Sequence, residues 1–515
     1  MTGKRPLEMI AMAGLIALYV AVRMWHLTDS CLWFDEIFSV HAAEQPLGQI
    51  LNFVAADLVH PPLFYLILKG WVGIGGSGLL WLRLLPVLFA SLAIIPFLLL
   101  SRELKLRDST TVFALLLLGV NGALIKYAQS VRMYTMLMLV SLVSIWLFTR
   151  YLNRNKGFVW LLLVNVLLVY THYFGCFVVG AEVIYVLAFN RSKTKPLLGM
   201  AAFVGILFSP WAIAVISAAR RGSEIAQNIS WIERPGPGQL WVFLIDLIEP
   251  FYYPGNNLDP NSIYAVSIPL LLVVFIAGFL FVSGRRSGEQ QKNKTTLVAA
   301  FLLIPIVFAF VLSWIMPQSI WGTRHLIVVM APATLLVSIF CTEIVHKFSV
   351  AAVTMVILFS AYAFFLVSVA PDRSYIWCSW EPMATDIKPF ESAPPQPLKL
   401  YASENLVAYH VWYATRNMSN VEVSVVRGGE SFVEDQTYFL PRQFDGIRRT
   451  PVEEINDANI VIFFRSEPPV LKGWLLTALT AKGYTPCPSR VNAIPPSTAY
   501  RIEMTKQPGN CLFQY

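Results

Sequence analysis

Two adjacent carboxylates, Asp35 and Glu36, stand in the aromatic-rich stretch from Trp33 to Ser39, directly after the first long apolar run of the chain. Ionisable groups are costly to place near a bilayer, and those found there usually serve a function. A carboxylate held within hydrogen-bond reach of a hydroxyl can act as a general base. The pair also suits a structural role, because acidic side chains favour the start of a helix.

Basic and aromatic residues recur where later apolar runs end. Arginines and histidines there can bind a phosphate and stabilise the charge that develops on it as a leaving group. Aromatic rings can cover the faces of a sugar or line a lipid channel. The residues of this kind, with the polar residues beside them, are Asp57, His60, Tyr65, Gln129, Arg132, Tyr134, His172, Tyr173, Arg324 and His325.

Each of these residues also has a structural interpretation. His60 precedes Pro61 and Pro62 and suits a rigid turn before a helix. Arg132 and Arg324 suit anchors that reach the membrane interface from the ends of spans. Lone histidines are often interfacial residues, and tyrosines form the aromatic belt of membrane proteins. The argument for chemistry therefore depends on whether these residues share one face of the membrane.

The elements that must position these residues are membrane helices. The chain has 515 residues, of which 56% are hydrophobic and 14% charged, and its apolar residues fall in runs long enough to cross a bilayer. The bases behind the net charge of +8 lie between these runs, so we expect no nucleic-acid partner. Eleven spans are expected, near residues 7–26, 79–101, 110–127, 133–150, 157–172, 173–190, 197–217, 263–283, 296–316, 326–345 and 349–370.

The distribution of Lys and Arg orients these spans. Segments on the side of the N-terminus carry most of the bases, among them Arg102, Lys105 and Arg107. The positive-inside rule therefore predicts a cytoplasmic N-terminus and an extracytoplasmic C-terminus. The run from Pro61 to Ile74 is too short to span a bilayer and is expected to form an interfacial or re-entrant helix at the outer face. This orientation places all the polar clusters at that same face.

The composition changes at about residue 371. Residues 1–370 form the expected transmembrane domain, and residues 371–515 form a soluble outer domain. Strands expected at 398–402, 421–426 and 460–464 and helices at 405–414 and 471–482 indicate a small α/β domain. The predicted fold class is therefore a polytopic α-helical membrane protein with a C-terminal soluble α/β domain. A disulfide between two of Cys378, Cys487 and Cys511 would leave the third unpaired, and the sequence does not choose the pair.

Together, these residue types fit transfer of a sugar from a lipid phosphate carrier to a hydroxyl at the membrane surface. The main alternative is a transporter or flippase of lipid-linked sugars or polymers, which also needs many spans. Transport predicts ionisable residues within the spans, where Glu182 is the clearest example. A third interpretation is a structural or assembly protein built around the soluble domain.

Several stretches also resemble a known family. They are Trp33-Phe34-Asp35-Glu36-Ile37-Phe38-Ser39, Asp57 with His60-Pro61-Pro62-Leu63-Phe64-Tyr65, Tyr127-Ala128-Gln129-Ser130-Val131-Arg132-Met133-Tyr134, Thr171-His172-Tyr173-Phe174-Gly175 and Arg324-His325. These stretches are similar to motifs of GT-C class membrane glycosyltransferases, in particular the bacterial protein O-mannosyltransferase and aminoarabinose transferase superfamily, which is glycosyltransferase family 39-like. The chain departs from the pattern at Ser130, where relatives carry glutamate, and at His325, where they carry tyrosine.

The resemblance implies an inverting reaction in the bacterial cytoplasmic membrane, from a polyprenyl-phosphate-sugar donor to a hydroxyl of a protein, lipid or glycan acceptor. Asp35 would be the catalytic base, and Glu36 would orient the acceptor or assist. Arg132 and Arg324 would hold the donor phosphate, with His60, His172 and His325 as further candidates. The residues expected to support the acceptor, the sugar or the loop are Asp57, Tyr65, Gln129, Tyr134 and Tyr173.

This scheme requires no cofactor. The carboxylates of Asp35, Glu36 and Asp57 nevertheless offer oxygens to a divalent cation, so metal dependence stays open. The chain has no Walker-type loop and no dinucleotide fingerprint, which argues against a soluble-nucleotide enzyme. The sugar, the acceptor and the oligomeric state are not predicted.

Overall fold

The computed structural model describes residues 4–221, 226–251, 289–344, 349–369, 375–387, 397–427, 438–442, 444–466, 474–494, 497–509 and 511. The chain divides into two compact units. The first unit comprises Met1–Leu27 and Ala42–Pro371, and the second comprises Thr28–His41 and Asp372–Tyr515. The short segment Thr28–His41 thus belongs to the same unit as the C-terminal part of the chain.

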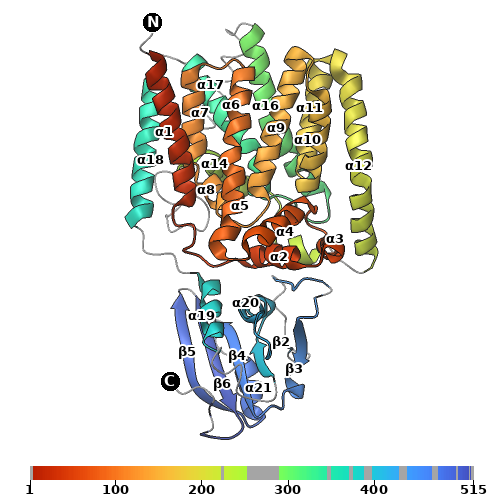
Figure 1. Ribbon diagram of the computed structural model, residues 1–515, viewed down its shortest axis with the longest axis vertical. Helices are drawn as coiled ribbons and strands as arrows, with labels where there is room; N and C mark the ends of the chain where they lie inside the picture. Colours follow the sequence, from red (N-terminus) through yellow and green to blue (C-terminus); the bar gives the residue numbers. More distant parts are fainter. Residues whose placement is uncertain are drawn as a thin grey trace. The chain divides into compact units, whose positions relative to one another are not determined.

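The first unit is helical. Figure 1 shows its long helices side by side, with α3 and α4 lying across one end of them. The described helices of this unit are α1 (Lys4–Met24), α3 (Leu47–Asp57), α4 (Leu63–Gly75), α5 (Leu79–Leu92), α6 (Ile94–Glu103), α7 (Asp108–Val120), α8 (Gly122–Ala128), α9 (Tyr134–Arg154), α10 (Phe158–Thr171), α11 (Gly175–Phe189), α12 (Thr194–Arg220), α13 (Ala226–Ile229), α14 (Pro237–Ile248), α16 (Glu289–Ile315), the 3₁₀ helix η2 (His325–Val329), α17 (Met330–Ile339), a π-helical turn (Phe340–Ile344) and α18 (Ser349–Val369).

Among the described residues, six helices are long and apolar enough to cross a membrane: Leu79–Glu103, Tyr134–Arg154, Arg191–Arg220, Lys292–Ile315, His325–Glu343 and Ser349–Val369. Shorter apolar helices include Met12–Met24, Asp108–Val120, Phe158–Thr171 and Gly175–Phe189. The expected span at 263–283 lies outside the described residues, so the number of eleven spans stays a prediction. The run expected to form an interfacial or re-entrant helix is helical, as α4, and its place at the outer face stays a prediction.

The expected single span over 110–127 is instead two helices, α7 and α8, which are divided at Asn121. The Asn121 side chain accepts a hydrogen bond from the Leu124 N–H at 2.9 Å and donates one to the Asp246 carbonyl at 2.8 Å. It therefore caps α8 and ties the break to α14. An apolar run alone does not reveal such a break, because the run continues through both helices.

A buried arginine donates hydrogen bonds to the backbone carbonyls at the C-terminal end of α7. Arg23, on α1, is fully buried, and its guanidinium donates to the carbonyls of Leu118 at 3.1 Å and Gly119 at 3.1 Å. These are carbonyls of the last turn of α7, which has no further helical residues to pair with them. A cation at a helix C-terminus is also favoured by the helix dipole. Arg23 therefore holds α1 against α7.

A closed hydrogen-bonded ring joins α9, α10 and α11. Ser144 Oγ lies 2.6 Å from Asn165 Oδ1 and 2.7 Å from Glu182 Oε1, and Asn165 Nδ2 lies 2.7 Å from Glu182 Oε2. Ser144 supplies one hydrogen to this ring, and the Asn165 amide presents one oxygen and one N–H. Three contacts need three donors, and reversing the amide does not change this count. The third hydrogen must come from Glu182, whose carboxyl is therefore protonated.

We expect Glu182→Gln to unfold at nearly the wild-type temperature, because a glutamine amide supplies the same oxygen and the same hydrogen to the ring. Glu182→Ala should lower the free energy of unfolding by about 1–3 kcal/mol, since it leaves Ser144 and Asn165 partly unpaired in an apolar core. Thermal unfolding of both variants in detergent measures the difference. A glutamine variant as unstable as the alanine variant would contradict the protonated ring.

The second unit is built on a six-stranded sheet in the order β3-β2-β1-β4-β6-β5. Its strands are β1 (Leu398–Ala402), β2 (Val421–Arg427), β3 (Ile447–Pro451), β4 (Asn459–Ser466), β5 (Thr485–Ile494) and β6 (Ser497–Thr505). β1 pairs in parallel with β2 and β4, and β2 with β3, whereas β6 is antiparallel to β4 and β5. The predicted strands and the helices α20 (Asn405–Thr415) and α21 (Trp474–Ala481) are present, so the predicted fold class is confirmed.

The core of this unit follows from alternation along β4. Ile460 and Ile462 join a buried cluster with Leu475 and Leu479 of α21. Val461, between the two isoleucines, is also fully buried and points to the opposite face, since successive strand residues face opposite sides. Buried residues on both faces explain why β4 is a nearly continuous apolar run, as is usual for a central strand.

The cysteines form two disulfides, Cys487–Cys511 and Cys31–Cys378. Pairing within residues 371–515 alone would leave Cys378 alone, but its partner comes from the other end of the chain, 347 residues away in sequence. Cys31 therefore ties the segment Thr28–His41 to the C-terminal part of the second unit. Cys176 and Cys341 are free thiols.

Candidate anion site in the first unit

Three histidines from distant parts of the sequence meet in the first unit. His60 lies between α3 and α4, His172 directly follows α10, and His325 begins η2. Ring centroids are 5.3 Å apart for His60 and His172 and 5.0 Å apart for His172 and His325. All three side chains are buried, between 3% and 6% exposed. The structure thus brings these three candidate phosphate ligands together within one unit, and their role stays a prediction.

Arginine side chains place positive charge beside this histidine cluster. Arg132 Nη2 lies 3.4 Å from His60 Nε2, and Arg132 is itself buried. Burial, together with the positive charges of Arg132 and Arg324, holds the pKa of His60 well below its usual value. His60 is therefore neutral at physiological pH. Asp57 Oδ2 lies 3.9 Å from His60 Nδ1, and Asp57 Oδ1 accepts a hydrogen bond from Asn228 at 2.9 Å.

The tautomer of His172 is fixed by the backbone. The N–H of Phe174 donates to His172 Nδ1 at 3.1 Å, so this nitrogen carries a lone pair and the ring is neutral with its proton on Nε2. Within the described part of the chain, Nε2 has no hydrogen-bond partner, although the side chain is only 3% exposed. A buried N–H without an acceptor is costly and points to an oxygen supplied by a ligand.

The same geometry decides between a cation and an anion. Nitrogens of His60, His172 and His325 lie within 4.8 Å of one another, a spacing that suits a metal ion. A metal on His172 would need the Nε2 lone pair, but the bond from Phe174 keeps the proton on that nitrogen. The guanidinium of Arg132 beside the cluster also repels a cation and attracts an anion. The cluster therefore suits an anion with several oxygen atoms.

His325 has a tightly defined place. The backbone N–H of His325 donates to the Gly322 carbonyl at 2.9 Å, and a Cβ on Gly322 would lie 2.8 Å from His325 Nδ1. Tyr134 faces His325 with ring centroids 6.1 Å apart. The charge of Arg324 is held near an aromatic ring, since its guanidinium lies 5.1 Å from the Trp231 ring centroid. Gly322 thus lets the His325 ring lie against the backbone that precedes it.

The remaining predicted support residues lie close to this site or brace its helices. Tyr65, on α4, is fully buried. The Tyr173 hydroxyl accepts a hydrogen bond from Trp211 at 3.3 Å. Gln129 Nε2 donates to the carbonyls of Arg23 at 3.2 Å and Trp25 at 2.6 Å. Gln129 therefore fixes the end of α8 to the end of α1, which is a structural role.

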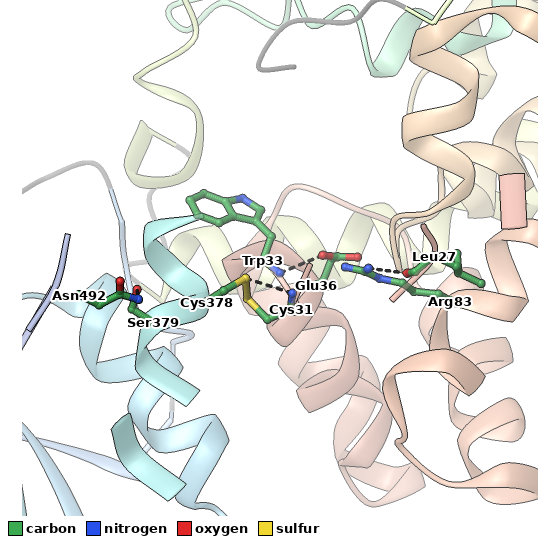
Figure 2. Close-up of a disulfide and its surroundings, with 8 residues drawn as sticks. All are labelled: Leu27, Cys31, Trp33, Glu36, Arg83, Cys378, Ser379 and Asn492. Carbon is green, nitrogen blue, oxygen red and sulfur yellow. Dashed lines mark hydrogen bonds between the residues drawn. A yellow bond between two sulfur atoms is a disulfide. The ribbon is translucent and has the colours of Figure 1, made fainter. Parts of the chain in front are cut away.

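The predicted acidic pair belongs to the second unit, at the start of α2 (Phe34–Glu44). Glu36 is buried, and its Oε2 accepts a hydrogen bond from the Trp33 N–H at 2.9 Å, as Figure 2 shows. This bond is the returning half of a capping box, in which the third helical residue satisfies the residue before the helix. Asp35 is half-buried, and its carbonyl accepts from the Ser39 hydroxyl at 3.1 Å. A capping role is thus observed for Glu36.

Comparison with known proteins identifies the fold. No family model and no curated protein matches the chain. The crystal structure of ArnT from Cupriavidus metallidurans bound to undecaprenyl phosphate is similar with a TM-score of 0.59 and 14% identity, over 98% of this chain and 99% of that chain. The chain therefore has a GT-C glycosyltransferase-like fold. Apo ArnT from the same organism gives the same TM-score and identity, over 98% of this chain and 100% of that chain.

A weaker similarity, with a TM-score of 0.43 and 12% identity, exists to the Archaeoglobus fulgidus oligosaccharyltransferase in complex with Zn and sulfate, over 78% of this chain and 61% of that chain.

The first unit also brings residues to the surroundings of the anion site that the sequence did not indicate. They are Tyr127, Thr323 and Asp246, whose electrostatic interactions connect them with one another and with Arg324. Tyr127 faces Tyr134 with ring centroids 5.1 Å apart, and Asp246 is buried. The spans expected from the sequence leave residues 218–262 as a loop, but α14 lies in this range and carries Asp246. The available signal was this acidic residue within an otherwise apolar run.

Proposed function

We propose that this protein is a membrane glycosyltransferase that moves a sugar from a polyprenyl-phosphate donor to a hydroxyl acceptor, with inversion at the anomeric carbon. The observation that carries the proposal is the buried His172 Nε2–H, in a histidine cluster that the Arg132 guanidinium contacts at His60. The His172 N–H requires an acceptor oxygen, and the positive charge of the guanidinium favours an anionic one. Support also comes from the GT-C fold and from the undecaprenyl phosphate bound to ArnT.

In this proposal, the donor phosphate lies among His60, His172, His325, Arg132 and Arg324. The arginines supply positive charge, and His172 supplies a neutral N–H to a phosphate oxygen. When the bond between the anomeric carbon and the phosphate oxygen breaks, its electron pair stays on the phosphate. Fixed donors and charges in a buried site stabilise this growing negative charge without rearrangement, which is the larger part of catalysis in such sites.

The acceptor half of the reaction is assigned to Asp35. Its carboxylate would take the proton of the acceptor hydroxyl as the oxygen attacks the anomeric carbon from the side opposite the phosphate. Glu36 would keep the start of α2 formed through its bond to Trp33. We place the reaction at the extracytoplasmic face of a bacterial cytoplasmic membrane, with the acceptor a protein, lipid or glycan.

The transporter alternative is less supported, because Glu182 sits in a closed ring with its hydrogen bonds satisfied.

The proposed chemistry uses no divalent cation. We therefore expect donor consumption to be unchanged, within about twofold, after EDTA treatment and after addition of excess Zn²⁺ or Mg²⁺, because repulsion by nearby arginines disfavours a cation at the phosphate site. Initial rates in washed membranes measure this. A rate that disappears with EDTA and returns with one metal would contradict the proposal and favour a metal held by carboxylates such as Asp35 and Asp57.

The direct test measures sugar release from radiolabelled polyprenyl-phosphate sugars in membranes that contain wild type, Arg324→Ala or the exposed-site control Arg221→Ala at matched levels. Wild type and control should consume at least one donor, and Arg324→Ala should lose about tenfold or more, since a lost charged hydrogen bond costs about 1.5–3 kcal/mol. Consumption of no donor by wild type, together with movement of labelled lipid across sealed vesicles, would favour transport.

A further inference from the structure

The segment that precedes α2 is anchored covalently in the second unit. Cys31 is bonded to Cys378 on the 3₁₀ helix η5 (Ile376–Ser379), as Figure 2 shows. Ser379, the last residue of η5, accepts a hydrogen bond at 3.0 Å from Asn492 on the edge strand β5. Cys31 is therefore linked through η5 to the sheet. The disulfide fixes the chain just before Trp33, whose N–H donates to the capping carboxylate of Glu36.

Aromatic rings hold the first turn of α2. Trp33 packs edge-on against Trp377 with ring centroids 4.3 Å apart, and against Tyr438 at 5.7 Å. Phe34 packs against Tyr409 of α20 at 5.0 Å and against Tyr438 at 5.3 Å. Trp33 and Phe34 are the two residues that precede Asp35 in the sequence. The residue before Asp35 is thus held by two rings of the second unit.

The same unit holds α2 again two turns later. His41 Nδ1 lies 3.0 Å from the Tyr409 hydroxyl, and its ring lies 4.7 Å from Trp412 and 4.6 Å from Phe444. Burial, with a contribution from the Arg416 charge, lowers the pKa of His41 to about 4, so the ring is neutral. Tyr409 therefore contacts both Phe34 and His41. We call Tyr409 and Trp412, the two residues of α20 that pack against this part of α2, the α20 seat.

These contacts can hold α2 in a defined position as well as bury its side chains. α2 has 11 residues, a length at which an isolated helix is marginal in water and depends on tertiary contacts. A base acts only when it is held within hydrogen-bond reach of the proton that it removes. Displacement by about 1 Å can cost about 10²-fold in rate. A helix that carries a base therefore benefits from anchors at both ends.

We infer that the soluble unit is a positioning element of the transfer reaction: Cys31–Cys378 and the α20 seat, centred on Tyr409, fix the start of α2 and thereby the place of Asp35. This inference rests on the proposed function, in which Asp35 is the base. Cys31, Cys378 and Tyr409 are positioning residues, since they act through α2. The disulfide also makes the reaction sensitive to reduction outside the membrane.

The test compares full-length Cys31→Ser/Cys378→Ser with the matched control Cys487→Ser/Cys511→Ser, which removes the other disulfide of the same unit. The rate of transfer is divided by the number of sites that bind radiolabelled undecaprenyl phosphate, so misfolded protein does not count. We expect kcat to fall about tenfold to a hundredfold in the first variant, with donor KM within about twofold of wild type, because only α2 is displaced. The control should keep the wild-type kcat.

A second measurement avoids any defect in folding. The control variant Cys487→Ser/Cys511→Ser, already folded in membranes, is treated with dithiothreitol, which then has only Cys31–Cys378 to reduce among the disulfides described. We expect the same fall in kcat, and recovery on reoxidation. Tyr409→Ala should lower kcat more than Tyr409→Phe, which keeps the ring that faces Phe34.

Failure of the inference and failure of the proposed function give different results. Wild-type transfer by Asp35→Asn in the same membranes would remove Asp35 as the base and with it the reason for positioning. Loss of transfer by Asp35→Asn, combined with a normal kcat after reduction and in Cys31→Ser/Cys378→Ser, would overturn the inference and leave the proposed function standing.

Discussion

His172→Asn is expected to lose about tenfold to a hundredfold in donor consumption, while His172→Gln keeps most of it. The asparagine side chain would place an oxygen near the Nδ1 position, where it can accept the Phe174 N–H, but it is too short to replace Nε2. Glutamine extends an N–H to the Nε2 position. The expected loss is that of one hydrogen bond to a charged group, about 1.5–3 kcal/mol.

The two substitutions separate a structural histidine from a ligand-binding one. If His172 only completed the turn after α10 through Phe174, the asparagine would be the better replacement and the glutamine the worse. Initial rates at saturating and limiting donor, with site counts from undecaprenyl phosphate binding, measure both. Equal rates for asparagine, glutamine and wild type would contradict a phosphate contact at Nε2.

Because His172 and His60 are neutral, we also expect no rise in donor affinity between pH 8 and pH 6.

The sequence predicted that the three histidines share one face of the membrane, because the expected orientation of the spans places them there. His60, His172 and His325 each lie at an end of an apolar run, and the positive-inside rule assigns those ends to one face. Proximity within that face follows once the helices pack. The geometry that separates an anion from a metal did not follow, because it depends on the Phe174 N–H, a backbone group that residue types do not reveal.

Other features depend on three-dimensional pairing. The partner of Cys378 could not be found within the soluble domain, since it is Cys31, in a segment that was assigned by sequence position to the transmembrane domain. The break at Asn121 depends on the Asp246 carbonyl, which lies far away in sequence. Apolar runs indicate that helices exist, whereas polar side chains that bond to distant backbone groups decide where helices end.

Glu36 shows how one residue can satisfy two interpretations. The sequence offered a functional pair or a helix cap, and the structure shows Glu36 in the cap through Trp33. A capping bond uses one carboxylate oxygen and fixes the turn that carries Asp35. The cap therefore agrees with a division of roles in which Glu36 orders the helix start and Asp35 performs the proton transfer.

Asp35→Asn is the substitution with the largest expected effect on transfer. Asparagine is the same size but cannot accept a proton, so transfer to the acceptor should fall by about 10²–10⁴-fold, the usual contribution of a general base. Donor binding should be unchanged, because the side chains proposed to bind the donor phosphate belong to the first unit and are intact. Asp35→Glu should recover part of the rate, since it restores a carboxylate at a displaced position.

Glu36→Gln and the exposed-site variant Asp29→Asn serve as matched controls, because both remove a neighbouring charge. Glutamine can still accept the Trp33 N–H, so Glu36→Gln should keep the cap and most of the transfer rate. Glu36→Ala should instead lower stability by about 0.5–2 kcal/mol through loss of the cap. Transfer to a hydroxyl acceptor and donor binding are measured in the same membranes. A wild-type rate in Asp35→Asn would show that the base is elsewhere, and Asp246, a buried carboxyl group on α14, would then be the residue to replace first.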